Sequence, residues 1–390
     1  MNKWISPNTI TGDAATGQRY LRRTHINEYF WREVDKGNHI LIVAPRRVGK
    51  TSIMQDLADN PPSGYCSIYQ NIESVKSKNE FYKRLFELLL HCTNKTTKAK
   101  KLFGKWFAKF GIEEITKSGI KFNKSDVDYE KMFRELIPDL KTEQIKTVIF
   151  LDEFAEVINK LNKQGLQEDA IDILHTLREL RSDPDFENFT LVYAGSIGLE
   201  YVISAIDRPK LINDLHRIKT ESLTSEEADQ LIKQLTHGAT IQLAPEIAAH
   251  LKEKINHLLP YYIQLMIEQI DLLARQKQEP AINNEIVNIA FDQVVKENRN
   301  FDDWLIRLKD YHKDNFPFIN EILKHAAKNN SITVQEIYNK AIDPQYNHGD
   351  DYMDHVEQLM YDGYLVEIEP HVYRFISPFL QKFWLKKYPV

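Results

Sequence analysis

The stretch that decides the fold is "HILIVAPRRVGKTSIMQDLAD", which runs from residue 39 to residue 59. The apolar run at its start predicts a buried strand, and the periodicity at its end predicts an amphipathic helix. Between them, "APRRVGKT" at 44–51 matches the phosphate-binding loop pattern, with Ala in place of the usual first Gly. Because the motif lies between a predicted strand and a predicted helix, we expect a phosphate-binding loop rather than an arginine-rich turn.

Each residue type in this loop has a chemical reason to be there. Gly49 lets the backbone turn so that successive N–H groups face an anion, and the following helix adds its positive N-terminal dipole. Lys50 supplies a charge to the β- and γ-phosphates, and the Thr51 hydroxyl is a ligand for Mg²⁺. The residues expected to line the nucleotide here are Ala44, Pro45, Arg46, Arg47, Val48, Gly49, Lys50, Thr51 and Ser52.

A second motif, "KTVIFLDEFAEVI" at 146–158, places two carboxylates at the end of an apolar strand. Ligands of open α/β sheets bind at the carboxyl ends of the strands. We therefore expect Asp152 to hold Mg²⁺ through water and Glu153 to polarise an attacking water. The alternative, two acids that cap an exposed turn, is weaker beside a phosphate-binding loop.

Two further polar residues follow later strands. Ser196, in "TLVYAGSIGLEYVI", is placed either to touch the γ-phosphate or the lytic water, or to cap the next helix. Both roles stay open. Arg217, in "DLHRIKTESL", is a candidate to stabilise the γ-phosphate of its own subunit or of a neighbour, with an ordinary surface arginine as the alternative.

The order of predicted elements indicates an α/β fold followed by helices. Apolar strand runs alternate with helical patterns, which predicts a mostly parallel, helix-covered sheet. From Thr224 the pattern is helical to about residue 300, and either Thr224 or Ser225 is the candidate N-cap of the first helix. The predicted strands lie at 39–44, 65–70, 147–152, 190–195 and 218–223.

The C-terminal part has its own pattern. After a charged stretch at 296–315, three helices and a hairpin follow in the order of a winged helix-turn-helix. We expect three domains: a core at 1–223 with a basic insertion at about 94–125, a helical lid at 224–305, and a winged helix at 306–390.

Composition narrows the class of protein. The net charge is −5, and the two cysteines, Cys66 and Cys92, form neither a disulfide framework nor a metal cluster. No signal peptide or membrane-spanning run is present, so a cytoplasmic protein is expected. The thirteen histidines include no metal-binding motif such as H-E-x-x-H, and no second catalytic centre is expected.

With these motifs in place, most of the chain resembles the archaeal-type P-loop ATPases, which are related to the STAND and AAA+ groups. The segments that carry the resemblance are "YLRRTHINEYFWREV", "APRRVGKTSIM", "VIFLDEF", "AGSIGLEYVI", "LHRIKTESLTSEEADQLI", "HLLPYYIQLM" and "HVYRFISPFLQKFWLKKY". Arg23 falls on the family's upstream arginine, and Pro260 on its lid proline beside the adenine. Arg22 and Leu258 stand where the family has glycines.

The resemblance implies an ASCE/AAA+-like P-loop NTPase that binds ATP and Mg²⁺ and hydrolyses ATP, with nucleotide state coupled to domain movement and partner binding. It does not select among biological roles. Two alternatives stay open: a nucleotide-gated DNA- or RNA-binding protein, and a signalling or defence scaffold that holds nucleotide with little turnover.

Charge argues against DNA binding by the winged helix. Residues 311–390 carry eight Lys and Arg against eleven Asp and Glu, and the expected recognition helix, "DDYMDHVEQLMYDG", has no basic residue. Phosphate contacts dominate nucleic-acid affinity, so a protein partner or self-association is favoured for this module.

One basic segment points the other way. Residues 94–124 hold nine lysines against two glutamates, with aromatic residues at helical spacing among them (Phe103, Trp106, Phe107 and Phe110). Nucleic acid could bind through 95–124. Packing of the aromatic stripe on the core, with the lysines solvated, is the favoured reading.

Overall fold

The computed structural model describes residues 3–93, 97–116, 119–122, 127–142, 144–195, 198–204, 206, 208–297 and 299–389. The chain divides into two compact units. The sheet unit consists of Arg22–Val43 and Lys50–Thr220, and the helical unit consists of Met1–Leu21, Ala44–Gly49 and Glu221–Val390. The chain therefore passes out of the sheet unit and back into it at the phosphate-binding loop.

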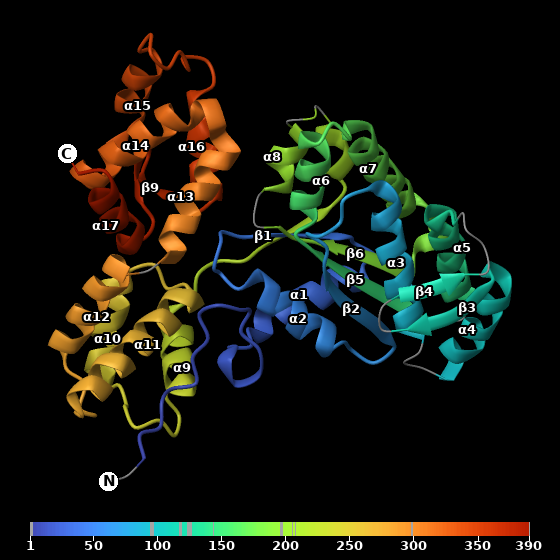
Figure 1. Ribbon diagram of the computed structural model, residues 1–390, viewed down its shortest axis with the longest axis horizontal. Coiled ribbons are helices and arrows are strands. Elements are labelled where there is room, and N and C mark those ends of the chain that lie inside the picture. The colour runs from blue at the N-terminus through green and yellow to red at the C-terminus, as the bar shows by residue number, and fades with distance from the viewer. Residues whose placement is uncertain are drawn as a thin grey trace. The chain divides into compact units, whose positions relative to one another are not determined.

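The sheet unit is built on five parallel strands in the order β2-β5-β6-β1-β7 (Figure 1). The strands are β1 (Ile40–Val43), β2 (Tyr65–Asn71), β5 (Lys146–Asp152), β6 (Phe189–Tyr193) and β7 (His216–Lys219). Buried apolar side chains fill β1, β5 and β6, as expected of strands covered on both faces. The predicted α/β P-loop fold class is confirmed.

The last strand differs from its predicted position at 218–223. It begins at His216, which pairs with Ile40 of β1, and it ends at Lys219 opposite Val43. Beyond that point Leu223 donates its N–H to the carbonyl of Leu258 at 2.9 Å, within the helical unit. The predicted strand was too long because Leu223, its last apolar residue, is buried in the core of the helical unit.

The helices of the sheet unit follow the strands in alternation (Figure 1). They are α1 (Thr24–Asp35), α2 (Lys50–Asp59), α3 (Lys78–Thr93), α5 (Tyr129–Thr142), α6 (Phe154–Lys163), α7 (Gln167–Ser182) and α8 (Leu199–Ser204), with short 3₁₀ turns at Pro184–Phe186 and Pro209–Ile212. Since parallel strands all end on one edge, α2 and α6 both begin at the carboxyl edge of the sheet.

The basic insertion forms α4 (Thr97–Phe110) and a hairpin of β3 (Ile112–Thr116) and β4 (Gly119–Phe122). Trp106 is fully buried and donates its indole N–H to Asp139 at 2.7 Å. The ring of Phe110 meets Phe86 edge to face at 5.9 Å. In the described part of this segment, the aromatic side chains therefore pack on the protein's own core, which supports the packing interpretation.

The helical unit begins with four helices: α9 (Ser225–Leu235), α10 (Pro245–Ile255), α11 (Pro260–Lys277) and α12 (Asn284–Glu297). Of the two candidate caps, Thr224 and Ser225, it is Thr224 that caps α9 and forms a capping box with Glu227. The N-terminal strip lies along these helices: the Asn8 N–H donates to Leu235, and the Trp4 indole donates to Asp271 at 3.0 Å. A 3₁₀ turn at Gly17–Arg19 completes the strip.

The charged stretch at 296–315 is largely a helix, α13 (Arg299–His312), followed by a 3₁₀ turn at Lys313–Asn315. Four apolar side chains at helical spacing are buried along it, namely Phe301, Trp304, Leu305 and Leu308. The charged residues of the stretch lie between these positions. The boundary expected between residues 305 and 306 falls inside this helix, and the three-domain division stays a prediction.

The C-terminal segment (316–389) contains four helices and a small antiparallel sheet (Figure 1). The helices are α14 (Phe316–Asn329), α15 (Val334–Ala341), α16 (Tyr352–Tyr361) and α17 (Pro378–Lys387). The strands β8 (Ile332–Thr333), β9 (Leu365–Glu369) and β10 (Val372–Phe375) pair in the order β8-β10-β9. This order of elements matches the one expected of a winged helix.

Among the described residues, no helix combines the length and the apolar character that crossing a membrane requires.

Candidate functional site

The two sequence motifs expected to bind nucleotide meet in the sheet unit. Thr51, in the first turn of α2, donates its hydroxyl to Oδ2 of Asp152 at 2.7 Å, across 101 residues of sequence. The same carboxylate oxygen accepts the Tyr69 hydroxyl at 2.9 Å. Asp152 is buried, and Lys50 is the first residue of α2. A hydroxyl, a carboxylate and a helix N-terminus therefore share one corner of the sheet.

Tyr69 is a member of this group that sequence reasoning missed. It lies on β2, next to β5, where the register pairs Tyr69 with Phe150 and Asn71 with Asp152. Burial and the charge of Asp152 raise the pKa of Tyr69 well above its usual value, so the phenol remains a hydrogen-bond donor. The strand run at 65–70 was recognised, but only its pairing with β5 places Tyr69 beside the carboxylate.

Glu153 has an unusual backbone. It precedes α6 with φ 60° and ψ 28°, in the left-handed region that side-chain-bearing residues rarely adopt, and its N–H donates to Oδ1 of Asp152 at 3.1 Å. Such conformations cluster at functional sites because surrounding structure must hold them. At the start of α6, the Glu153 side chain makes no cap hydrogen bond.

The oxygen atoms around Thr51 suit a hard cation. Mg²⁺ takes oxygen ligands, usually one or two from protein, and keeps several waters. The Thr51 hydroxyl and the Asp152 carboxylate are such donors, and their direct contact brings them to one point. The residues therefore fit the ion that the motifs imply.

The loop residues 44–49 belong to the helical unit. Ala44 and Val48 are buried in the same apolar cluster as Leu223 and Leu259. Within the loop, Arg47 has φ 65° and Gly49 has φ 98°. The left-handed position at Gly49 matches the backbone freedom expected there.

Three residues of the loop lie against separate parts of the helical unit. The guanidinium of Arg47 lies 4.4 Å from the ring centre of Tyr261 on α11, and that of Arg46 lies 5.7 Å from the ring of Trp304 on α13. A Cβ placed on Gly363, just after α16, would come within 3.1 Å of Pro45.

Arg46 is half-buried. Burial, helped by the nearby charges of Arg307 and Arg47, lowers the pKa of its guanidinium. Stacking on Trp304 offsets part of that desolvation. Arg46 therefore lies packed against an aromatic ring of α13.

Other predicted site residues are placed as follows. Arg217 on β7 is exposed and pairs with Glu200 of α8 at 2.6 Å. Arg23 is buried at the start of α1, in the sheet unit, and Pro260 is the first residue of α11, in the helical unit. Ser196 lies outside the described residues. Ser52 is buried one residue after Thr51.

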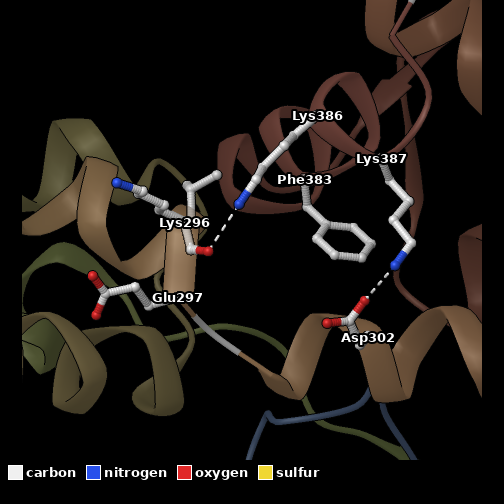
Figure 2. A pocket seen from close by; sticks show the side chains of 7 residues that line it. Lys296, Glu297, Asp302, Phe383, Lys386 and Lys387 are labelled. Carbon is white, nitrogen blue, oxygen red and sulfur yellow. Dashed lines mark hydrogen bonds and ion pairs between the residues drawn. The ribbon is translucent and has the colours of Figure 1, made fainter.

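The lysines of α17 bear on nucleic-acid binding. Lys386 donates to the Lys296 carbonyl at 2.8 Å, and Lys387 to Asp302 at 2.9 Å, on either side of a shallow pocket that Phe383 also lines (Figure 2). Lys382 pairs with Asp292 at 3.0 Å. Three of the basic residues in the C-terminal segment therefore tie α17 to α12 and α13, and have intramolecular partners in place of phosphates.

Comparison with solved structures assigns the fold. The Walker-type ATPase paby2304 of Pyrococcus abyssi is similar at 14% sequence identity, with a TM-score of 0.66 over 96% of this chain and 99% of that one. The ORC2 protein of Aeropyrum pernix, solved as ADPNP–ADP complexes, is similar at 11% identity, with a TM-score of 0.57 over 98% of this chain and 95% of that one. No family model and no curated protein matches the chain.

The chain thus has the fold of an archaeal-type P-loop ATPase over nearly its full length. The resemblance stated from the motifs is confirmed at that level. At these identities the likeness establishes the arrangement of the elements.

Proposed function

We propose that the protein is an ATP-binding, Mg²⁺-dependent ATPase that acts as a switch or remodelling enzyme. The observation that carries this proposal is the Thr51–Asp152 hydrogen bond, which joins the phosphate-loop hydroxyl to the carboxylate at the end of β5. A protein with this fold, the Aeropyrum pernix ORC2 protein, has been solved with ADPNP and ADP.

Each residue of the corner has a role in the proposal. Lys50 and the N-terminus of α2 hold the phosphates, while Thr51 and Asp152 would hold Mg²⁺, which neutralises charge on the phosphate oxygens. Glu153 orients a water and accepts its proton as that water attacks the γ-phosphorus. Tyr69 donates to Asp152 and fixes the orientation of the carboxylate.

Nucleotide state would reach the helical unit through the loop itself. Pro45, Arg46 and Arg47 contact Gly363, Trp304 and Tyr261, which lie after α16, on α13 and on α11. A loop that closes around phosphates changes its backbone geometry, so these contacts must adjust when nucleotide binds. The two arginines are therefore proposed to transmit occupancy to α11 and α13.

Four further residues keep the roles predicted for them. Arg217 would stabilise the γ-phosphate after releasing Glu200, and Ser196 would contact the γ-phosphate or the water. Arg23 and Pro260 would contact the base. Each of these is a proposal that a nucleotide-bound structure tests directly.

Two substitutions test the proposal. Lys50→Ala removes the phosphate charge and is expected to abolish ATP binding. Glu153→Gln keeps the shape of the side chain and is expected to retain ATP binding while slowing turnover by about 10²–10⁴-fold, the usual worth of a general base. Isothermal titration with ATP and Mg²⁺, together with phosphate release, separates the two effects.

The outcomes distinguish the competing functions. Absence of both binding and hydrolysis in the wild type would overturn the proposal. Tight binding without turnover at saturating ATP would indicate the scaffold instead.

We propose a protein partner for the C-terminal segment because its recognition-helix position, α16, is acidic and three lysines of α17 have intramolecular partners.

A further inference from the structure

Three side chains with metal-ligating atoms come together at the start of α16, in a part of the C-terminal segment that the proposed ATPase chemistry does not use. They are His348, Asp351 and His355, whose ligand atoms all lie within 4.8 Å of one another. The sequence predicted no histidine metal motif, because H-x-x-D-x-x-x-H is not a familiar zinc pattern. The folded chain nevertheless gathers two imidazoles around one carboxylate.

Two of the separations are close to those of ligands around a single ion. Nδ1 of His348 lies 3.1 Å from Oδ1 of Asp351, and Nε2 of His355 lies 3.6 Å from Oδ2. Two atoms bound at about 2.0–2.1 Å in a tetrahedral zinc site are about 3.3–3.4 Å apart.

The backbone holds the three residues in register. The His348 N–H donates to the Ala341 carbonyl at 2.8 Å, which fixes the loop to the end of α15. Asp351 is the N-cap residue of α16 and His355 lies four residues later, on the same face of the helix.

The Asp351 side chain does not cap the helix. An aspartate at an N-cap normally accepts a backbone N–H of the first turn, whereas Asp351 makes no side-chain cap hydrogen bond. Its carboxylate is directed to the two histidines instead. The carboxylate is therefore oriented by the histidine cluster and not by the helix backbone.

The surroundings are apolar on one side. The ring of Phe318 stacks on His348 with centroids 4.8 Å apart and meets His355 edge to face at 5.8 Å. His355 is buried, with 9% of its surface exposed, and His312 lies beside it at 6.1 Å between ring centres. An apolar shell around ligands limits solvent access and strengthens metal binding.

We propose that His348, Asp351 and His355 bind one divalent transition-metal ion of the zinc class. Two imidazoles and one carboxylate suit Zn²⁺ and the neighbouring first-row ions, whereas Mg²⁺ and Ca²⁺ favour sites made entirely of oxygen. The bound ion links the loop after α15 to the first turn of α16. The competing account is a pair of ordinary His–Asp contacts that need no metal.

The test uses the untagged full-length chain without nucleotide, freed of metal by dialysis against a chelator. Calorimetric titration with Zn²⁺ is expected to give one equivalent of tight binding, and Co²⁺ is expected to show the visible absorption of nitrogen-coordinated metal. His348→Ala and Asp351→Asn should each weaken binding by at least about 100-fold, since outer partners of a metal site alone are worth about 10–100-fold. Asp351 is exposed, and Asp351→Asn keeps the shape of the side chain. This variant therefore tests the site even if His348→Ala disturbs the loop.

The matched control is His325→Ala. His325 pairs with Glu336 at 3.2 Å in the same segment but belongs to no three-ligand group among the described residues. Zinc binding in this variant should equal that of the wild type. The proposal is overturned if the wild type takes up no zinc, or if Asp351→Asn binds it as tightly as the wild type does.

Discussion

The two ends of the phosphate-binding segment belong to different environments. Lys50 and Thr51 start a helix of the sheet unit, where Thr51 donates to a buried carboxylate. Ala44 to Val48, a few residues earlier, pack among aromatic and aliphatic side chains of the helical unit. In the proposed function, the first environment acts on phosphate, and the second responds to the shape of the loop.

The difference between the two environments explains where Arg46 and Arg47 lie. In most contexts two consecutive arginines would lie in solvent or hold phosphate directly. Here Arg46 and Arg47 stack on Trp304 and Tyr261, so their positions depend on α13 and α11. A short loop thus carries both the expected ligand-binding residues and the contacts through which binding can be read.

The largest expected effect breaks the chemical side of the comparison. Asp152→Ala removes the acceptor of both Thr51 and Tyr69. We expect Mg²⁺-dependent ATP hydrolysis to fall by about 100-fold or more, because the metal loses its protein carboxylate. Steady-state phosphate release measures this, with Glu168→Ala, an exposed carboxylate of α7, as the control that should keep wild-type turnover.

The second prediction tests the packing of the loop against the helical unit. Gly363→Ala places a methyl group 3.1 Å from Pro45, at a residue with φ 80°. We expect the free energy of unfolding to fall by about 2–3 kcal/mol, from the left-handed backbone and from overpacking, and ATP affinity to fall with it. Urea unfolding and ATP titration measure the two effects.

Gly238 provides the matched control for that substitution. It also has a left-handed backbone, φ 72°, but no atom lies within 4 Å of the added methyl group. Gly238→Ala should therefore cost only about 1–2 kcal/mol and leave ATP affinity unchanged. Equal effects of the two variants on affinity would contradict the role given to the Pro45 contact.

A third prediction separates the stability of the two units by pH. Burial lowers the pKa of His39, in the sheet unit, to about 3, and its Nδ1 accepts the Leu191 N–H at 2.9 Å. The unfolded chain binds a proton below about pH 6.5 that the folded chain does not. The stabilisation is thus complete above pH 6.5 and is lost as the pH falls toward 3, with a slope of up to about 1.4 kcal/mol per pH unit.

His39→Asn keeps an acceptor near the position of Nδ1 and removes this titration. Thermal unfolding between pH 4 and pH 7 should show a smaller loss of stability for the variant. The helical unit keeps its own acid sensitivity, because burial lowers the pKa of His257 to about 4. An unchanged pH dependence in His39→Asn would contradict the assignment.

The smallest expected effect concerns Tyr69. Tyr69→Phe deletes one donor to Asp152 while Thr51 retains the other. We expect the free energy of Mg²⁺ binding to weaken by about 0.5–1.5 kcal/mol. The Mg²⁺ concentration that gives half-maximal turnover should therefore rise several-fold. Tyr82→Phe, a buried tyrosine of α3 away from the corner, is the control and should leave the Mg²⁺ titration unchanged.

Local signals of sequence were sufficient for the elements that carry them. The strand–loop–helix at 39–59, the strand ending in Asp152 and the Thr224 capping box depend on neighbours within a few residues, and each is found where the pattern placed it. Thr51 and Asp152 were both predicted to hold Mg²⁺, because each follows the carboxyl end of a strand in one parallel sheet. The fold class followed from the same alternation of strands and helices.

Tertiary structure decided everything that depends on pairing across long separations. The strand order β2-β5-β6-β1-β7 puts Tyr69 beside Asp152, and packing of the helical unit puts Trp304 against Arg46. From the sequence, α13 was described only as a charged stretch, because charged residues lie between the apolar residues that the fold buries. The sequence by itself predicted the chemistry at the turn, since the motif is local. The fold alone decided which aromatic rings the turn touches, since those contacts join residues more than 200 positions apart.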